Sequence, residues 1–123
     1  MLFTMSAYAE QSYQLSTHIL DITKGLPFPN VEIKLYKLNK DGQTWSFIAQ
    51  GVTDKNGRIA NFLPEDKNDG TYKLQFLTYK YFKSQGLNSI YPYVDLVFSI
   101  SGKSHYHIPI TMSANGFATD KGN

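Results

Sequence analysis

Turn-forming residues recur at short intervals along the chain, and this spacing constrains the fold more than any other feature. The turns centre on Lys24-Gly25, Pro27, Pro29-Asn30, Asp41-Gly42, Asn56-Gly57, Asn68-Asp69-Gly70, Gly102 and Asn115-Gly116. The segments between them are rich in Val, Ile, Tyr, Phe and Thr, which favour β-strands. Short strands separated by regular turns are typical of a β-sandwich or β-barrel. The sequence therefore predicts an all-β fold.

Apolar and polar residues alternate within these segments, as in strands that bury one face. Val31, Ile33 and Leu35, for example, are separated by single charged residues. We expect strands over residues 13–21, 31–38, 47–52, 58–62, 71–78, 93–100 and 105–113, with a short last strand after Asn115-Gly116. Residues 79–85 lack the alternation and stop at Gly86, so they are predicted to form one short helix.

Length and composition exclude several classes of protein. The 123 residues suit one domain, and 41% hydrophobic content can fill its core. The net charge of +2 comes from residues spread along the chain without a basic stripe, so nucleic acid is not an expected partner. No segment approaches the roughly 20 apolar residues of a membrane-spanning helix, so no membrane partner is expected. Cysteine is absent, which excludes disulfides and thiolate chemistry.

The first residues form a separate segment in this interpretation. Residues 1–12 are predicted to be a leader or the remnant of a signal peptide, and residues 13–123 the folded domain. Ala7-Tyr8-Ala9 matches the A-x-A pattern of signal-peptidase sites, although the basic start of a signal is missing. Two interpretations stay open: the end of a longer signal, or a plain leader. We expect a periplasmic location under the first and a cytoplasmic one under the second.

Three histidines are the most informative polar residues. His105 and His107 are two residues apart in a predicted strand, so both project from one face. His18 faces away from the core, because Leu15, Thr17 and Ile19 are predicted to face inward. Histidines so placed can titrate near neutrality, or they can simply be solvated strand residues. H-x-H with a third histidine also resembles a zinc site, but nothing in the sequence brings His18 beside His107, and neither a metal nor a cofactor is expected.

Several separated motifs resemble those of one known family. They are Leu15-Ser16-Thr17-His18-Ile19-Leu20-Asp21 followed by Gly25 and Pro27, Gly51-Val52-Thr53 running into Asp54-Lys55-Asn56-Gly57-Arg58, then Tyr81-Phe82, Tyr91-Pro92, and His105-Tyr106-His107-Ile108-Pro109. In this order and spacing they are similar to the motifs of the transthyretin-like 5-hydroxyisourate hydrolases. The resemblance extends from about Leu15 to the end of the chain.

The resemblance implies a fold, an activity and a site. The implied fold is a transthyretin-like sandwich of two sheets with one short helix. The implied activity is hydrolysis of a ring C–N bond of 5-hydroxyisourate in urate and purine degradation, with His18, Arg58 and His107 as the catalytic residues. The resemblance also implies that this chain forms a homotetramer with active sites at the subunit interfaces. The alternative is a transthyretin-like protein that binds a small molecule without catalysis.

The end of the chain departs from the family pattern. The hydrolases typically finish in Tyr-Arg-Gly-Ser, and the last serine belongs to the active site. Asp120-Lys121-Gly122-Asn123 stands here instead, and Ser113-Ala114 replaces the usual Ser-Pro. Glycine and, with Lys121, a positive charge are kept, whereas the aromatic and the hydroxyl are lost; by their alignment with the family ending, Lys121 and Asn123 are predicted to contact the substrate.

Overall fold

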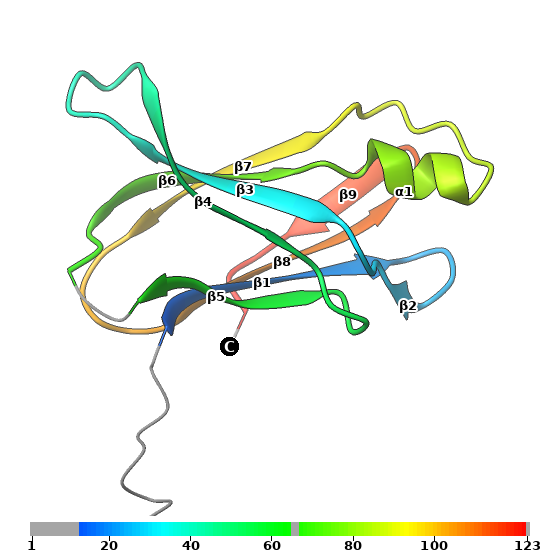
Figure 1. Ribbon diagram of the computed structural model, residues 1–123, viewed down its shortest axis with the longest axis horizontal. Coiled ribbons are helices and arrows are strands. Elements are labelled where there is room, and N and C mark those ends of the chain that lie inside the picture. Colours follow the sequence, from blue (N-terminus) through cyan, green and yellow to red (C-terminus); the bar gives the residue numbers. More distant parts are fainter. Residues whose placement is uncertain (1–12, 65–66, 123) are drawn as a thin grey trace, which may run out of the picture.

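The computed structural model describes residues 13–64 and 67–122, and there it shows two facing β-sheets with one short helix at one end (Figure 1). The strands are β1 (Tyr13–Asp21), β2 (Leu26–Pro27), β3 (Glu32–Leu38), β4 (Trp45–Val52), β5 (Arg58–Pro64), β6 (Gly70–Phe76), β7 (Val94–Ile100), β8 (Tyr106–Ser113) and β9 (Gly116–Thr119). The helix α1 (Tyr79–Ser84) lies between β6 and β7 in the chain. The predicted all-β, two-sheet sandwich with one short helix is confirmed.

The two sheets have different strand arrangements. One sheet has the order β4-β3-β6-β7, and all its neighbours are antiparallel. The other has the order β2-β1-β8-β9, with β5 also paired to β1. Its central pair, β1 and β8, is parallel. The buried Thr17 hydroxyl donates a hydrogen bond of 2.7 Å to the Ile108 carbonyl, which ties these two strands together.

The core lies between the sheets and follows the predicted alternation. The fully buried side chains include Leu15, Ile19, Ile33, Leu35, Tyr72, Leu74, Phe76, Ile100, Ile110 and Met112. Because successive side chains of a strand point to opposite faces, the residues between these positions face outward. The outer face of the β5-β1-β8 region is therefore available for polar groups.

The helix closes one end of the sandwich through aromatic contacts. Phe82 is buried and meets Phe28 edge to face, with ring centroids 5.4 Å apart. The Tyr81 ring stacks on the Phe28 ring with centroids 3.7 Å apart, and the Tyr81 hydroxyl donates a hydrogen bond to the buried Asp21 carboxylate. In the described part of the chain, no helix is long and apolar enough to cross a membrane.

The structure departs from the expected elements in a few places. The two-residue strand β2 was not predicted, since a pair that includes a proline gives no alternation to detect. Alternation along β8 puts Tyr106 on the same side as the buried Ile108 and Ile110, but Tyr106 is only partly buried. It begins β8 at the end of the sandwich, where its hydroxyl contacts the backbone of Ser101. The predicted leader, residues 1–12, lies outside the described residues.

Candidate active site

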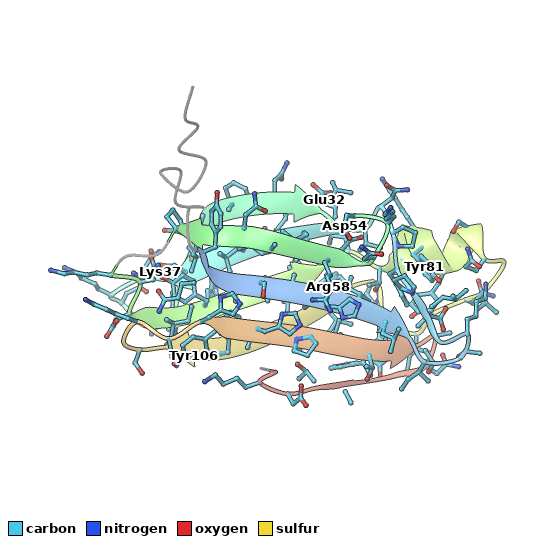
Figure 2. The ribbon with its side chains drawn as sticks, turned by 90° about the horizontal axis from the view of Figure 1, so that it is seen from below. Glu32, Lys37, Asp54, Arg58, Tyr81 and Tyr106 are labelled. Atoms are coloured by element: carbon cyan, nitrogen blue, oxygen red, sulfur yellow. The ribbon has the colours of Figure 1, made fainter. Side chains whose placement is uncertain are left out.

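His18 lies in the middle of β1 and has a neighbour on each side. Arg58 of β5 is its direct antiparallel partner, and Pro109 of β8 is its parallel partner. Directly opposite residues share a sheet face, with Cβ atoms about 4.5–5.5 Å apart in antiparallel pairs. His18 and Arg58 therefore lie side by side on the outer face, which Figure 2 views with Arg58 and Asp54 labelled.

A tight turn sets the position of Arg58 at the start of β5. The Asp54 carboxylate accepts hydrogen bonds from the backbone N–H groups of Asn56 and Arg58, at 2.8 and 3.0 Å. Gly57 takes a φ of +75°, and its carbonyl accepts a 2.9 Å hydrogen bond from the Ile19 N–H. A Cβ at Gly57 would come within 2.6 Å of the Ile19 carbonyl oxygen. Only glycine fits this turn, and the turn delivers Arg58 to His18.

His107 reaches the same face from β8. Its parallel partner in β1 is Ser16, whose Oγ lies 2.8 Å from His107 Nδ1. The ring centroids of His18 and His107 are 6.4 Å apart with an angle of 33° between their planes. The structure therefore brings the three residues predicted to be catalytic onto one face, while their catalytic roles stay predictions.

Burial and the nearby arginine favour the neutral form of both histidines. Partial burial lowers the pKa of His18 below 6.5, and Arg58 lowers it further, against opposing effects of Asn56 and Asp54. Partial burial also lowers the pKa of His107, and the charge of Arg58 acts in the same direction. A neutral imidazole can accept a proton at pH 7, whereas a protonated one cannot. The face therefore combines two potential bases with one permanent cation.

The C-terminal segment folds back onto His107. The Gly122 N–H donates a 2.8 Å hydrogen bond to the His107 carbonyl. A Cβ at Gly122 would come within 2.8 Å of His107 Cδ2, so a side chain there would press on the imidazole ring. The Lys121 ammonium lies 4.5 Å from the centre of the Tyr106 ring. Asn123 lies outside the described residues, so substrate contacts by Lys121 and Asn123 stay predictions.

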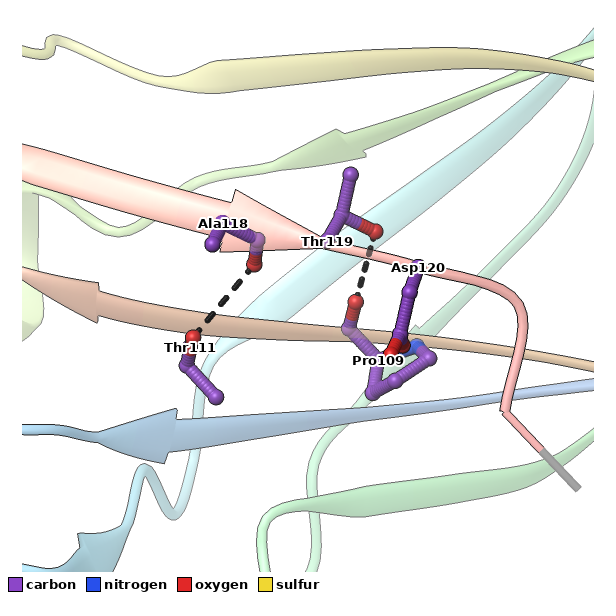
Figure 3. A pocket seen from close by; sticks show the side chains of 5 residues that line it. All are labelled: Pro109, Thr111, Ala118, Thr119 and Asp120. Carbon is purple, nitrogen blue, oxygen red and sulfur yellow. Dashed lines mark hydrogen bonds between the residues drawn. The ribbon is translucent and has the colours of Figure 1, made fainter.

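A small hollow continues the histidine face toward β9 (Figure 3). Its volume is about 110 Å³, and it is lined by Pro109, Thr111, Ala118, Thr119 and Asp120. The Thr119 hydroxyl donates to the Pro109 carbonyl at 2.7 Å and closes one side. Pockets for small ligands are usually about 300–1,000 Å³, so this hollow is too small to enclose such a ligand on a single chain.

Sequence reasoning missed two neighbours of His107. Ser16 contacts its imidazole directly, and the Asp120 carboxylate raises its pKa against the lowering effects. Ser16 is two residues before His18 in the opening motif, so alternation along the strand could have placed it on the His18 face. Its pairing with His107 depends on the parallel β1–β8 register, which no local pattern reveals. Among the residues the structure describes, no group of three His, Cys, Asp or Glu side chains could hold a metal ion.

Comparisons with known proteins agree with the motif resemblance. The 5-hydroxyisourate hydrolase of Mus musculus is 36% identical, covering 93% of this chain and 98% of the relative. The 5-hydroxyisourate hydrolase of Salmonella typhi is 38% identical, covering 94% and 85%.

Solved structures of a hydrolase and of a transthyretin also resemble this chain. The structure of Klebsiella pneumoniae 5-hydroxyisourate hydrolase matches with a TM-score of 0.78 and 32% identity, covering 90% of this chain and 99% of that one. Sea bream transthyretin in complex with thyroxine matches with a TM-score of 0.81 and 31% identity, covering 88% and 93%. The sequence model of the HIUase/Transthyretin family matches residues 15–122, where HIUase abbreviates 5-hydroxyisourate hydrolase. The chain belongs to the HIUase/Transthyretin family.

Proposed function

We propose that this protein hydrolyses 5-hydroxyisourate, opening a ring C–N bond in the degradation of urate. The observation that carries the proposal is the gathering of His18, Arg58 and His107 on one outer sheet face. Relatives at 36–38% identity that match over nearly the whole chain are 5-hydroxyisourate hydrolases. These residues supply the groups that hydrolysis of a cyclic amide requires.

The chemistry divides into three roles. One neutral histidine takes a proton from water, and the resulting hydroxide attacks a ring carbonyl carbon. Negative charge develops on the carbonyl oxygen, and the fixed Arg58 guanidinium stabilises it. The C–N bond then breaks as the histidine that took the proton, now an imidazolium, returns it to the leaving nitrogen. Water is consumed, and the products are an N–H group and a carboxylic acid, which releases its proton to solvent and becomes a carboxylate.

We also propose that the active site is completed in a homotetramer, at interfaces between subunits. The support is the openness of the histidine face, whose hollow of about 110 Å³ cannot enclose a substrate alone. Leu20 and Pro109 on this face are only partly buried, which leaves apolar surface that another subunit can cover. Most homo-oligomers are built from two-fold symmetric contacts of this kind.

A second candidate function is binding of a small molecule without catalysis. The similarity to sea bream transthyretin in its thyroxine complex favours it. The two candidates differ in one measurement, the decay of 5-hydroxyisourate absorbance with and without protein. Acceleration that scales with protein concentration supports the hydrolase. Unaccelerated decay together with saturable ligand binding supports the binding protein.

Export to the periplasm is a further part of the proposal, supported by the Ala7-Tyr8-Ala9 pattern. Cleavage after Ala9 predicts that protein purified from its natural host begins at Glu10. Mass spectrometry of that protein tests the prediction, and an intact Met1 would favour a cytoplasmic location.

A further inference from the structure

Four groups form a continuous hydrogen-bonded chain that ends at the imidazole of His107. The Tyr13 carbonyl oxygen lies 2.8 Å from His105 Nδ1. The other nitrogen of that ring, Nε2, lies 2.8 Å from Ser16 Oγ. Ser16 Oγ lies 2.8 Å from His107 Nδ1. All three distances are those of well-formed hydrogen bonds.

The direction of each hydrogen bond follows from what each atom can do. A carbonyl oxygen only accepts, so His105 Nδ1 carries the proton. In neutral His105 the Nε2 atom then accepts, and its donor is the Ser16 hydroxyl. That hydroxyl has one proton, so its oxygen must accept from His107. His107 Nδ1 is therefore protonated, and in the neutral ring Nε2 has a free lone pair.

We propose that Ser16 and His105 are positioning residues that hold neutral His107 in the tautomer with an unprotonated Nε2, which makes His107 the general base. This inference rests on the proposed hydrolase function for its catalytic part only. Free imidazole exchanges between two tautomers, and only one offers Nε2 as an acceptor. When His107 takes the proton of water, the Ser16 oxygen continues to accept from Nδ1 and stabilises the charged ring.

The surroundings of His107 agree with this role. Arg58 on β5, together with His18 and His105, disfavours a positive charge on the ring, whereas Asp120 favours one. No carboxylate accepts from Nδ1 in the described residues; the partner there is the Ser16 hydroxyl. A hydroxyl can donate or accept a hydrogen bond, so the direction of the bond between Ser16 and His107 depends on His105. Because the Tyr13 carbonyl holds the proton of neutral His105 on Nδ1, His105 Nε2 accepts the Ser16 proton and leaves the Ser16 oxygen to accept from His107.

Ser16→Ala and Ser16→Thr form a matched pair of variants. Ser16→Ala removes the hydroxyl, and we expect kcat to fall about tenfold with a smaller change in KM. Ser16→Thr keeps the hydroxyl on a residue that favours strands, so it should restore most of the rate. Ser99→Ala, an exposed strand serine of the other sheet, should leave kcat unchanged. His105→Ala removes the ring that accepts the proton of the Ser16 hydroxyl. We expect kcat to fall in this variant, but less than in His107→Ala.

The direct test is nitrogen-15 NMR of the imidazole rings in the ligand-free protein at a pH where His107 is neutral. We expect Nδ1 of His107 to carry the proton in the parent and in Ser16→Thr. Ser16→Ala and His105→Ala should show a mixture of tautomers. A parent spectrum with the proton on Nε2, or a Ser16→Ala variant with unchanged tautomer and kcat, would overturn the inference.

The same experiments separate failure of this inference from failure of the proposed function. If the parent protein does not hydrolyse 5-hydroxyisourate but has the expected tautomer, the hydrolase proposal fails and the hydrogen-bonded chain stands. If the parent is active but its tautomer is the opposite one, the hydrolase stands and the positioning role fails.

Discussion

The imidazole rings of His18 and His107 lie 6.4 Å apart, centre to centre, on the outer face of the β1–β8 pair. Hydrogen bonds in catalysis span about 2.6–3.2 Å between heavy atoms, so one bound group can lie between the rings and contact both. Arg58 borders the same space as the strand partner of His18. This arrangement makes the roles of the three residues testable one at a time.

Removing any of the three side chains should slow hydrolysis without unfolding the protein. We expect His18→Ala, Arg58→Ala and His107→Ala each to lower kcat/KM at least about tenfold, or 1.4 kcal/mol of activation free energy. All three face away from the core, so the melting temperature should stay close to that of the parent. An ultraviolet assay and thermal unfolding measure both. A fully active Arg58→Ala variant would contradict the assigned oxyanion role.

Stability should depend on pH through the same histidines. The pKa values of His18 and His107 are lowered in the folded protein, chiefly by burial, so the unfolded chain binds protons more readily. Above about pH 6.5 both histidines are neutral in the folded and in the unfolded chain, so they do not change the free energy of unfolding. As the pH drops from there through the lowered pKa values, the unfolded chain binds protons first, and the free energy of unfolding should fall. Urea unfolding at pH 7.5 and 5.5 measures the difference. His18→Gln with His107→Gln should reduce it, and an unchanged difference would refute this origin.

The turn before Arg58 should tolerate no side chain at Gly57. Gly57→Ala adds a Cβ 2.6 Å from a backbone oxygen at a φ of +75°, so we expect about 3 kcal/mol of destabilisation. Gly42→Ala is the matched control, with a φ of +71° and nothing within 4 Å of the added Cβ. It should cost only the left-handed backbone penalty of about 1 kcal/mol. Chemical unfolding compares the two, and equal losses would contradict the steric argument.

The proposed homotetramer should be sensitive to charge on the histidine face. Leu20 lies on this face of β1, two positions from His18, so Leu20→Glu should produce a smaller species and lose activity. Lys34→Glu, on the outer face of the other sheet, is the control and should keep the assembly. Light scattering measures both. A parent species of 14.0 kDa at micromolar concentration would contradict the assembly and a site shared between subunits.

The chain end can be tested by restoring the family tetrapeptide. Asp120→Tyr, Lys121→Arg and Asn123→Ser together create that ending while keeping Gly122, whose N–H contacts the His107 carbonyl. If the natural end is a weakened version of the family's, the variant should hydrolyse 5-hydroxyisourate faster in the ultraviolet assay. A parent and a variant that are both inactive would favour the binding protein.

The sequence by itself determined the strands, their faces and the turns. Alternation along a strand is a local property, so Leu15, Thr17 and Ile19 could be assigned to the core and His18 to the outer face. Asn56-Gly57 could be assigned to a turn because only glycine adopts its backbone angles freely. The strand β2 escaped prediction because two residues carry no periodicity.

Only the tertiary structure decided which outward residues meet. Alternation gives the face of a side chain but not the strand beside it, so the residues alone could not join His18 to His107. Family resemblance supplied that grouping, but it did not reveal the hydrogen bonds from Ser16 to His105 and His107. Those bonds depend on the parallel register of β1 with β8, two strands at opposite ends of the chain. Such a register is set by the packing of both sheets around one core, which no local segment encodes.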